Sequence, residues 1–168
     1  MNNVNTQQAV KQGSEPDSFE KGALFEEYIT MLFNERHFKL NEWRKSEKFA
    51  NGVVPFGHCF PDLELIFMGK TEHRFAIECK WKKEFRDGKI KWADKKKIRI
   101  YKQFQKEKRM IVFIAIGIGG EASNPERLFV TPLDMICNKR WISESDLLKF
   151  NRKPKQRFFY DTVQLRLW

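Results

Sequence analysis

Long apolar segments are missing from this sequence of 168 residues. No run approaches the ~20 apolar residues that a membrane-spanning helix needs. The opening segment, "MNNVNTQQAVKQGSEPDS", lacks the basic-then-apolar order of a secretion signal. These absences predict a protein that stays in the cytoplasm and has no membrane partner.

Cysteine and histidine are scarce, with three of each. Cys59, Cys79 and Cys137 are odd in number, far apart and without CxxC spacing, which argues against a disulfide framework or a zinc knuckle. The few histidines disfavour HNH-like and phospholipase-D-type sites, and no GxSxG motif occurs. The sequence therefore lacks the signatures of several common hydrolases.

Positive charge is what the sequence has in excess. The formal net charge is +10, and residues 81–109 alone hold 13 Lys or Arg against 4 Asp or Glu. Such an excess indicates a polyanionic partner, with nucleic acid ahead of an anionic membrane surface. Aromatic residues interleave with these cations, so they either pack in the core or stack on bases. The simpler interpretation, a solvated basic helix face, stays open.

Length and composition predict one domain, since 41% of the residues are apolar. We expect a disordered tail over 1–16 and a single domain over 17–168. Within this domain, a core spans about 18–131 and a C-terminal helix and strand extension covers 132–168.

Hydrophobic periodicity and turn residues predict the elements of this domain. Their order, a helix, three strands, a basic helix and a buried strand, predicts an α/β fold with an αβββαβ core, in which helices flank a mixed central sheet. Helices are expected at 17–38, 93–108 and 143–150, and strands at 38–49, 62–68, 74–81, 110–118, 127–132 and 158–168, with a Gly- and Pro-containing loop at 50–61.

The segment "FAIECKW", residues 75–81, places an acid and a base inside an apolar strand. Alternation puts Glu78 and Lys80 on one face, and a hairpin partner strand brings Asp62 beside them. Two neighbouring carboxylates repel each other unless a cation lies between them, and hard oxygen ligands suit Mg²⁺. The competing interpretation is an ordinary salt bridge between strands.

The order of these residues, Pro61–Asp62, then 15 residues, then Glu78–Cys79–Lys80, resembles the motif of the PD-(D/E)XK nuclease superfamily. "GALFE", ending in Glu26, is similar to a helix that precedes the core in restriction-endonuclease-like and Holliday-junction-resolvase-like members. On a helical wheel Glu26 lies about 70° from the centre of the apolar stripe. It therefore points toward the sheet, unless it pairs with a surface lysine.

The resemblance implies a metal-dependent endonuclease that hydrolyses phosphodiester bonds in DNA. Asp62, Glu78 and the main-chain carbonyl of Cys79 would hold Mg²⁺, with Mn²⁺ as a possible substitute. Glu26 would complete the site directly or through water, and Lys80 would position the attacking water.

The basic segment would bind the nucleic-acid backbone, so binding should weaken with salt. Family members often direct a Gln or Tyr of this helix to the site, which points weakly to Gln103 and to Tyr101, although core packing is the better expectation for Tyr101. The residues expected to contact nucleic acid are Lys82, Lys83, Lys95, Lys96, Lys97, Arg99, Lys102 and Gln103.

Two other functions stay open beside the nuclease. One is a non-cleaving nucleic-acid-binding module on the same fold, and the other is a basic interaction protein whose Asp62, Glu78 and Lys80 form a salt bridge. DNA is the expected substrate, with RNA left open. The apolar end "VQLRLW", residues 163–168, suggests a homodimer or a strand that closes the sheet.

Overall fold

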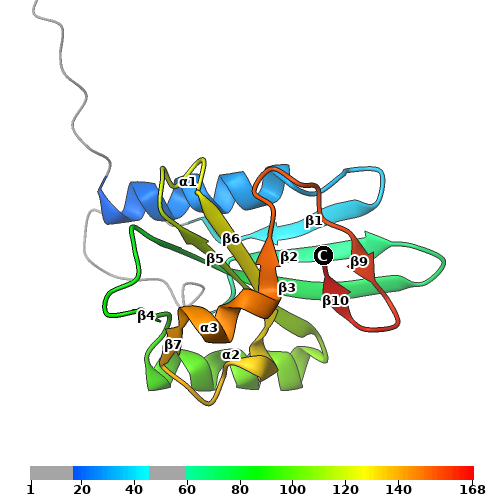
Figure 1. The fold of residues 1–168 in the computed structure, drawn as a ribbon. Coiled ribbons are helices and arrows are strands. Elements are labelled where there is room, and N and C mark those ends of the chain that lie inside the picture. The colour runs from blue at the N-terminus through cyan, green and yellow to red at the C-terminus, as the bar shows by residue number, and fades with distance from the viewer. Residues whose placement is uncertain (1–16, 46–59) are drawn as a thin grey trace, which may run out of the picture.

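The computed structural model describes residues 17–45 and 60–168. A six-stranded mixed sheet forms its centre, in the order β1-β2-β3-β5-β6-β8. Helix α1 packs on one face of this sheet and α2 on the other (Figure 1). The elements are α1 (Ser18–Met31), β1 (Phe38–Trp43), β2 (Leu63–Met68), β3 (Glu72–Lys82), β4 (Lys89–Lys91), α2 (Lys95–Lys108), β5 (Ile111–Ile118), β6 (Arg127–Pro132), β7 (Trp141–Ser143), α3 (Glu144–Leu147), β8 (Asn151–Arg152), β9 (Tyr160–Asp161) and β10 (Arg166–Leu167).

Helix α1 begins with a capping box, in which the Asp17 carboxylate accepts the amides of the first turn and the Glu20 carboxylate accepts the Asp17 amide. The helix ends at Met31, earlier than the expected residue 38, because residues 32–37 turn the chain into β1. The apolar stripe is confirmed from Phe25 onward, whereas Phe19 in the first turn is 53% exposed.

The three strands that carry the predicted motif are central. β2 and β3 pair antiparallel with Leu63 opposite Ile77, and β3 pairs parallel with β5 with Glu78 opposite Ile114. Helix α2 makes the crossover between β3 and β5, as a parallel pair requires. The sequence therefore predicted the αβββαβ order correctly, with β4 as an additional short strand before α2.

Close packing joins α1 to the sheet at Gly117 of β5. A Cβ atom built on Gly117 would lie 2.4 Å from Cε2 of Phe25, so only glycine allows the helix to approach this strand. Phe25 is 1% exposed and is followed directly by Glu26. The packing of Phe25 on Gly117 thus fixes the position of the next residue, Glu26, relative to the sheet.

Two parts of the expected architecture were wrong or missed. The segment 158–168 is not one strand: β9 and β10 form a hairpin, because the Asp161 carboxylate accepts the amides of Val163 and Gln164, and Leu165 has a φ of 51°. The β4–β7 ribbon was missed, and so was the tight turn before it, in which Asp87 and Gly88 both have positive φ and Arg86 lies opposite Lys89.

The expected tail at 1–16 lies outside the described residues, as do the end of the strand expected at 38–49 and most of the loop expected at 50–61. In the described ranges, no helix is long and apolar enough to cross a membrane. The C-terminal hairpin leaves apolar side chains exposed, with Val163 at 90% and Phe159 at 64%. A homodimer through this end stays a prediction.

Candidate active site

The predicted acidic and basic residues meet where β2 enters the sheet beside β3. The Asp62 Oδ2 atom accepts a hydrogen bond of 2.7 Å from the backbone amide of Cys79. The Lys80 ammonium donates to Oε1 of Glu78 and forms an ion pair with it. Asp62, Glu78 and Lys80 therefore form one cluster, as the alternation of the two strands predicted.

Glu78 is the most enclosed member of this cluster, with 1% of its surface exposed. Its Oε1 atom is bound by Lys80, whereas its Oε2 atom is buried without a hydrogen-bond partner among the residues that the structure describes. A buried charged oxygen without a partner is costly, because it has lost its water and gained nothing in exchange. Such an oxygen is suited to a ligand that the polypeptide does not supply.

The carboxyl group of Asp62 is held in an electrostatically unfavourable place. Burial raises its pKa well above the usual value, the negative charges of Glu78 and Glu26 raise it further, and Lys80 and the amide of Cys79 oppose this shift. A positive charge between the carboxylates would remove most of the repulsion.

Lys80 stays protonated in this setting. Burial alone would lower the pKa of its ammonium, but the carboxylates of Glu78 and Asp62 outweigh that effect, so the pKa is raised overall. Its side chain is 21% exposed, so the ammonium is enclosed by the cluster but not cut off from solvent. A lysine in this state is a hydrogen-bond donor and a positive charge rather than a base.

Glu26 lies under the cluster, on the face that α1 covers. It is 2% exposed and its Oε2 atom accepts a 2.9 Å hydrogen bond from the Trp43 indole. Its charge raises the pKa of both Asp62 and the Cys79 thiol, which places it near these two residues. The prediction that Glu26 points inward is confirmed. Its pairing with Trp43 was not foreseen.

The Cys79 side chain lies on the face of the sheet that α1 covers. Burial raises the pKa of its thiol, and the carboxylates of Asp62, Glu26 and Glu78 raise it further. The thiol therefore stays protonated and takes the role of an apolar core side chain. The part of Cys79 that belongs to the site is its main chain, whose amide is bound by Asp62.

Tyr101 of α2 covers the cluster from the other face of the sheet. Its side chain is fully buried, and burial and the negative charge of Glu78 raise the pKa of its hydroxyl. The hydroxyl lies close enough to Glu78 for its carboxylate to raise this pKa as a hydrogen-bond acceptor, but among the described residues no hydrogen bond of regular geometry joins the two groups. Packing in the core, the better expectation for Tyr101, agrees with this position, and the hydroxyl nevertheless faces the site.

Lysine and arginine side chains surround the C-terminal end of β3. Burial lowers the pKa of Lys82, and the neighbouring charges of Lys80, Arg86 and Lys91 lower it further. Arg86 and Lys91 come from the β4 hairpin, which sequence reasoning missed, and the Asp87–Gly88 turn is the signal that would have placed them there. A field of several cations beside two carboxylates favours an anionic group next to the site.

Most of the remaining predicted nucleic-acid contacts lie on α2. Gln103 is exposed there and donates to Glu107, so the structure does not bring it to the carboxylates. Lys95, Lys96, Arg99 and Lys102 are exposed on the same helix, Lys97 is half-buried, and Lys83 is exposed after β3.

Arg44 is a second neighbour that sequence reasoning missed. It forms ion pairs with Glu42 and with Glu64, which is buried, and its guanidinium donates to the carbonyl of Pro61. These contacts hold the segment that leads into Asp62. Glu64 is therefore occupied by a structural ion pair.

The described residues contain no group of three or more His, Cys, Asp or Glu side chains arranged to hold a metal ion. What they contain is a pair of carboxylates, Asp62 and Glu78, one with an oxygen that lacks a partner. Mg²⁺ keeps several of its waters and needs only one or two protein carboxylates, so this pair fits it.

The fold is of the α/β class, with a mixed central sheet flanked by helices. No family model and no curated protein matches the sequence. Among solved structures, the chain is similar to Hjc, a Holliday junction resolvase from Archaeoglobus fulgidus. The TM-score is 0.51 at 17% identity, over 77% of this chain and 91% of that one. At this identity the likeness shows the fold, and the predicted fold is confirmed.

Proposed function

We propose that this protein is a divalent-cation-dependent nuclease that hydrolyses phosphodiester bonds in DNA. The observation that carries the proposal is the Oε2 atom of Glu78, which is buried without a partner beside Asp62. A salt bridge with Lys80 uses only the other oxygen, Oε1. The resolvase fold of the similar structure supports a nuclease over unrelated functions of a basic protein.

In this proposal Asp62, Glu78 and the main-chain carbonyl of Cys79 hold Mg²⁺, and Mn²⁺ substitutes for it. When bound, the cation polarises the scissile phosphate and makes hydroxide available near neutral pH, an effect of several kcal/mol. Glu26 completes the cation site, either as a direct ligand or through a water molecule. Its charge also acts on Asp62. Its burial and its hydrogen bond from Trp43 keep it in one place.

Lys80 has the role of an electrostatic donor. Without metal the carboxylates of Glu78 and Asp62 raise the pKa of Lys80, so its ammonium is charged and donates hydrogen bonds. We propose that it donates hydrogen bonds to the attacking water and to the phosphate, and so orients them. Lys82, Lys83 and the neighbouring Arg86 draw the DNA backbone toward this end of β3.

Cleavage of plasmid DNA and of four-way junction DNA, with Mg²⁺, Mn²⁺ or EDTA, tests the proposal. Wild type should cut with either metal, and Asp62→Asn and Lys80→Met should lose at least about 100-fold in rate. Asp87→Asn is the matched control, because Asp87 is exposed in a turn. Binding by all variants without cutting by wild type would instead favour a non-cleaving DNA-binding module.

A further inference from the structure

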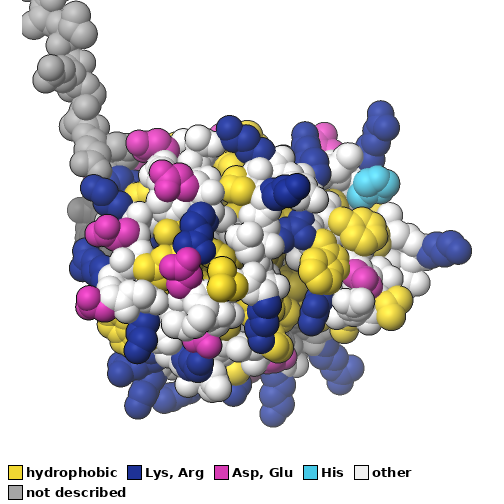
Figure 2. Space-filling model, in the orientation of Figure 1, with side chains coloured by type: hydrophobic (Ala, Val, Ile, Leu, Met, Phe, Trp, Pro, Cys, Tyr) yellow, Lys and Arg dark blue, Asp and Glu magenta, His cyan; other side chains and the backbone are white. Residues whose placement is uncertain are grey.

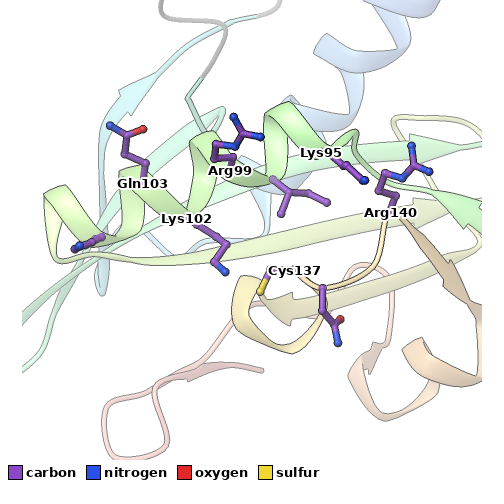
Figure 3. Close-up of a pocket in the computed structure, with 9 residues that line it drawn as sticks. Lys95, Arg99, Lys102, Gln103, Cys137 and Arg140 are labelled. Carbon is purple, nitrogen blue, oxygen red and sulfur yellow. The ribbon is translucent and has the colours of Figure 1, made fainter.

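An open groove lies between the outer face of α2 and the segment that follows β6. Its volume is about 750 Å³. Figure 3 shows Lys102 pointing from α2 toward the segment that carries Cys137, and Arg140 beside Lys95. We call this feature the α2 groove. Its charged lining residues are Lys95, Arg99, Lys102, Lys106 and Arg140.

Within residues 17–45 and 60–168, no acidic side chain neutralises the cations of the α2 groove. None of them forms an ion pair with a described residue, and no carboxylate lines the groove. Nearby acidic side chains have other partners, since Asp134 accepts from Gln105 and Asp146 pairs with Lys139. Figure 2 shows Lys and Arg side chains along the lower edge of the molecule, where Figure 1 places α2.

The spacing of the four helical cations fits an extended ligand. Lys95, Arg99, Lys102 and Lys106 follow one another at intervals of four, three and four residues, so they form a stripe about 16 Å long on one side of the helix. Over that length of its axis one strand of duplex DNA carries about five phosphates, and those that face the helix lie within reach of several of the cations. All four side chains are exposed, as is Arg140. A small ligand would not need a stripe of this length, whereas a polyanion can use all of it.

The α2 groove is separate from the carboxylate cluster. Tyr101 and Phe104 on the inner side of α2 are buried against the sheet, and the hydroxyl of Tyr101 faces Glu78. The groove cations leave the same helix on its outer side. Because a helix with its side chains is about 10 Å across, a phosphate in the groove cannot be the one next to Asp62.

We infer that the α2 groove binds a second stretch of DNA backbone, apart from the phosphate that is cut. The inference rests on the proposed nuclease function for the identity of its ligand. It adds Lys106 and Arg140, which lie outside the contacts that the sequence suggested, and it divides the basic surface into two sites. One set of cations acts beside Lys80, and the other holds DNA at a distance from it.

The salt dependence of DNA affinity tests this inference without cleavage. A fluorescent 30-base-pair duplex is titrated in EDTA with wild type, with an Arg99→Ala, Lys102→Ala, Arg140→Ala triple variant, and with a control. The control, Lys39→Ala, Lys70→Ala, Arg74→Ala, also removes three exposed cations that form no ion pair with a described residue.

The groove variant should lose at least about tenfold in affinity at 0.1 M salt, and its slope of log K against log salt should fall by about 2 to 3. The control should lose less than about 1 in slope. Equal losses in the two triple variants would show that net charge alone matters and would overturn the inference. An unchanged slope in the groove variant would overturn it too.

Cys137 provides a second readout, because it lines the groove and is partly accessible, whereas Cys79 is buried. Saturating duplex in EDTA should slow the alkylation of Cys137 by N-ethylmaleimide several-fold, as measured by mass spectrometry of its peptide. An alkylation rate that DNA does not change would contradict occupation of the groove.

The two proposals fail in different ways. Wild type that binds through the groove but cuts with no metal would remove the nuclease function and leave the groove. Wild type that cuts, while the groove variant binds DNA as wild type does, would remove the groove and leave the nuclease.

Discussion

Replacing Asp62 by Asn should stabilise the protein without metal and abolish its stabilisation by metal. In the metal-free protein, burial and the negative charges of Glu78 and Glu26 raise the pKa of Asp62, so its ionised form is disfavoured. Asn has the same shape and no charge, and its side-chain oxygen can still accept from the amide of Cys79. The same substitution removes a ligand that Mg²⁺ needs.

The sign of the pH dependence follows from the raised pKa of Asp62. The native carboxyl binds its proton more tightly than the unfolded chain does, so stability falls as pH rises above the unfolded value of about 3.9. The fall continues until the pH passes the folded pKa. Asp62→Asn should lack this part of the decline when unfolding is followed in EDTA.

Two opposing effects set the magnitude at neutral pH without metal. Burial and the charges of Glu78 and Glu26 disfavour ionised Asp62, and Lys80 offsets part of this effect, so removing the charge gains on the order of 2 kcal/mol. The hydrogen bond from Cys79 loses about 1 kcal/mol when its acceptor loses its charge. The variant should therefore gain about 1 kcal/mol, or about 2–4 °C in melting temperature for a chain of this size.

With metal bound, wild type should be more stable than Asp62→Asn. At a free Mg²⁺ concentration 100 times its Kd, wild type gains about 2.7 kcal/mol, which corresponds to about 5–10 °C. Asp62→Asn should gain almost nothing. Melting followed by circular dichroism, with EDTA and with Mg²⁺ or Mn²⁺, measures both effects, and Asp87→Asn should stay within about 0.5 kcal/mol of wild type. A variant that is destabilised in EDTA, together with a wild type that ignores metal, would refute the reasoning.

Three further substitutions test the packing and charges around the site. Lys80→Met should lower the free energy of unfolding in EDTA by about 3 kcal/mol, because it leaves both oxygens of Glu78 buried without a hydrogen-bond partner among the described residues. Mg²⁺ should restore part of this loss. A variant as stable as wild type would contradict the ion pair. Tyr101→Phe should change the stability by less than about 1 kcal/mol, because the hydroxyl makes no hydrogen bond of regular geometry although it faces Glu78. A larger loss would show that the hydroxyl is bound to that carboxylate. Gly117→Ala should lower the free energy of unfolding in urea by about 1–3 kcal/mol, because its Cβ atom would lie 2.4 Å from the Phe25 ring. No loss of stability would mean that α1 can move away from β5.

The part of the site on β2 and β3 was predictable because it depends on alternation alone. Once Leu63 and Ile77 pair, Asp62, Glu78 and Lys80 must gather at one place. The helical wheel predicted that the Glu26 side chain points toward the sheet. Its partner Trp43 was not predictable, because the contact between α1 and β1 depends on packing across the sheet.

The misses have local causes that periodicity does not register. "FFYDTVQLRLW" alternates like a strand, but the Asp161 carboxylate binds two following amides and turns the chain into a hairpin. The β4–β7 ribbon joins segments that are about 50 residues apart, so its pairing cannot be read from either segment alone. The cations Arg86 and Lys91 were missed for a different reason, because the local Asp87–Gly88 turn that places Arg86 opposite Lys89 was not recognised.

The most direct measurement of the central claim is an anomalous difference map of crystals soaked in Mn²⁺. The account predicts a peak between Asp62 and Glu78, roughly 2 Å from one carboxylate oxygen of each, with the Oε2 atom of Glu78 as a ligand. A map without a peak between these carboxylates, with the ion pair of Lys80 and Glu78 unchanged, would contradict it.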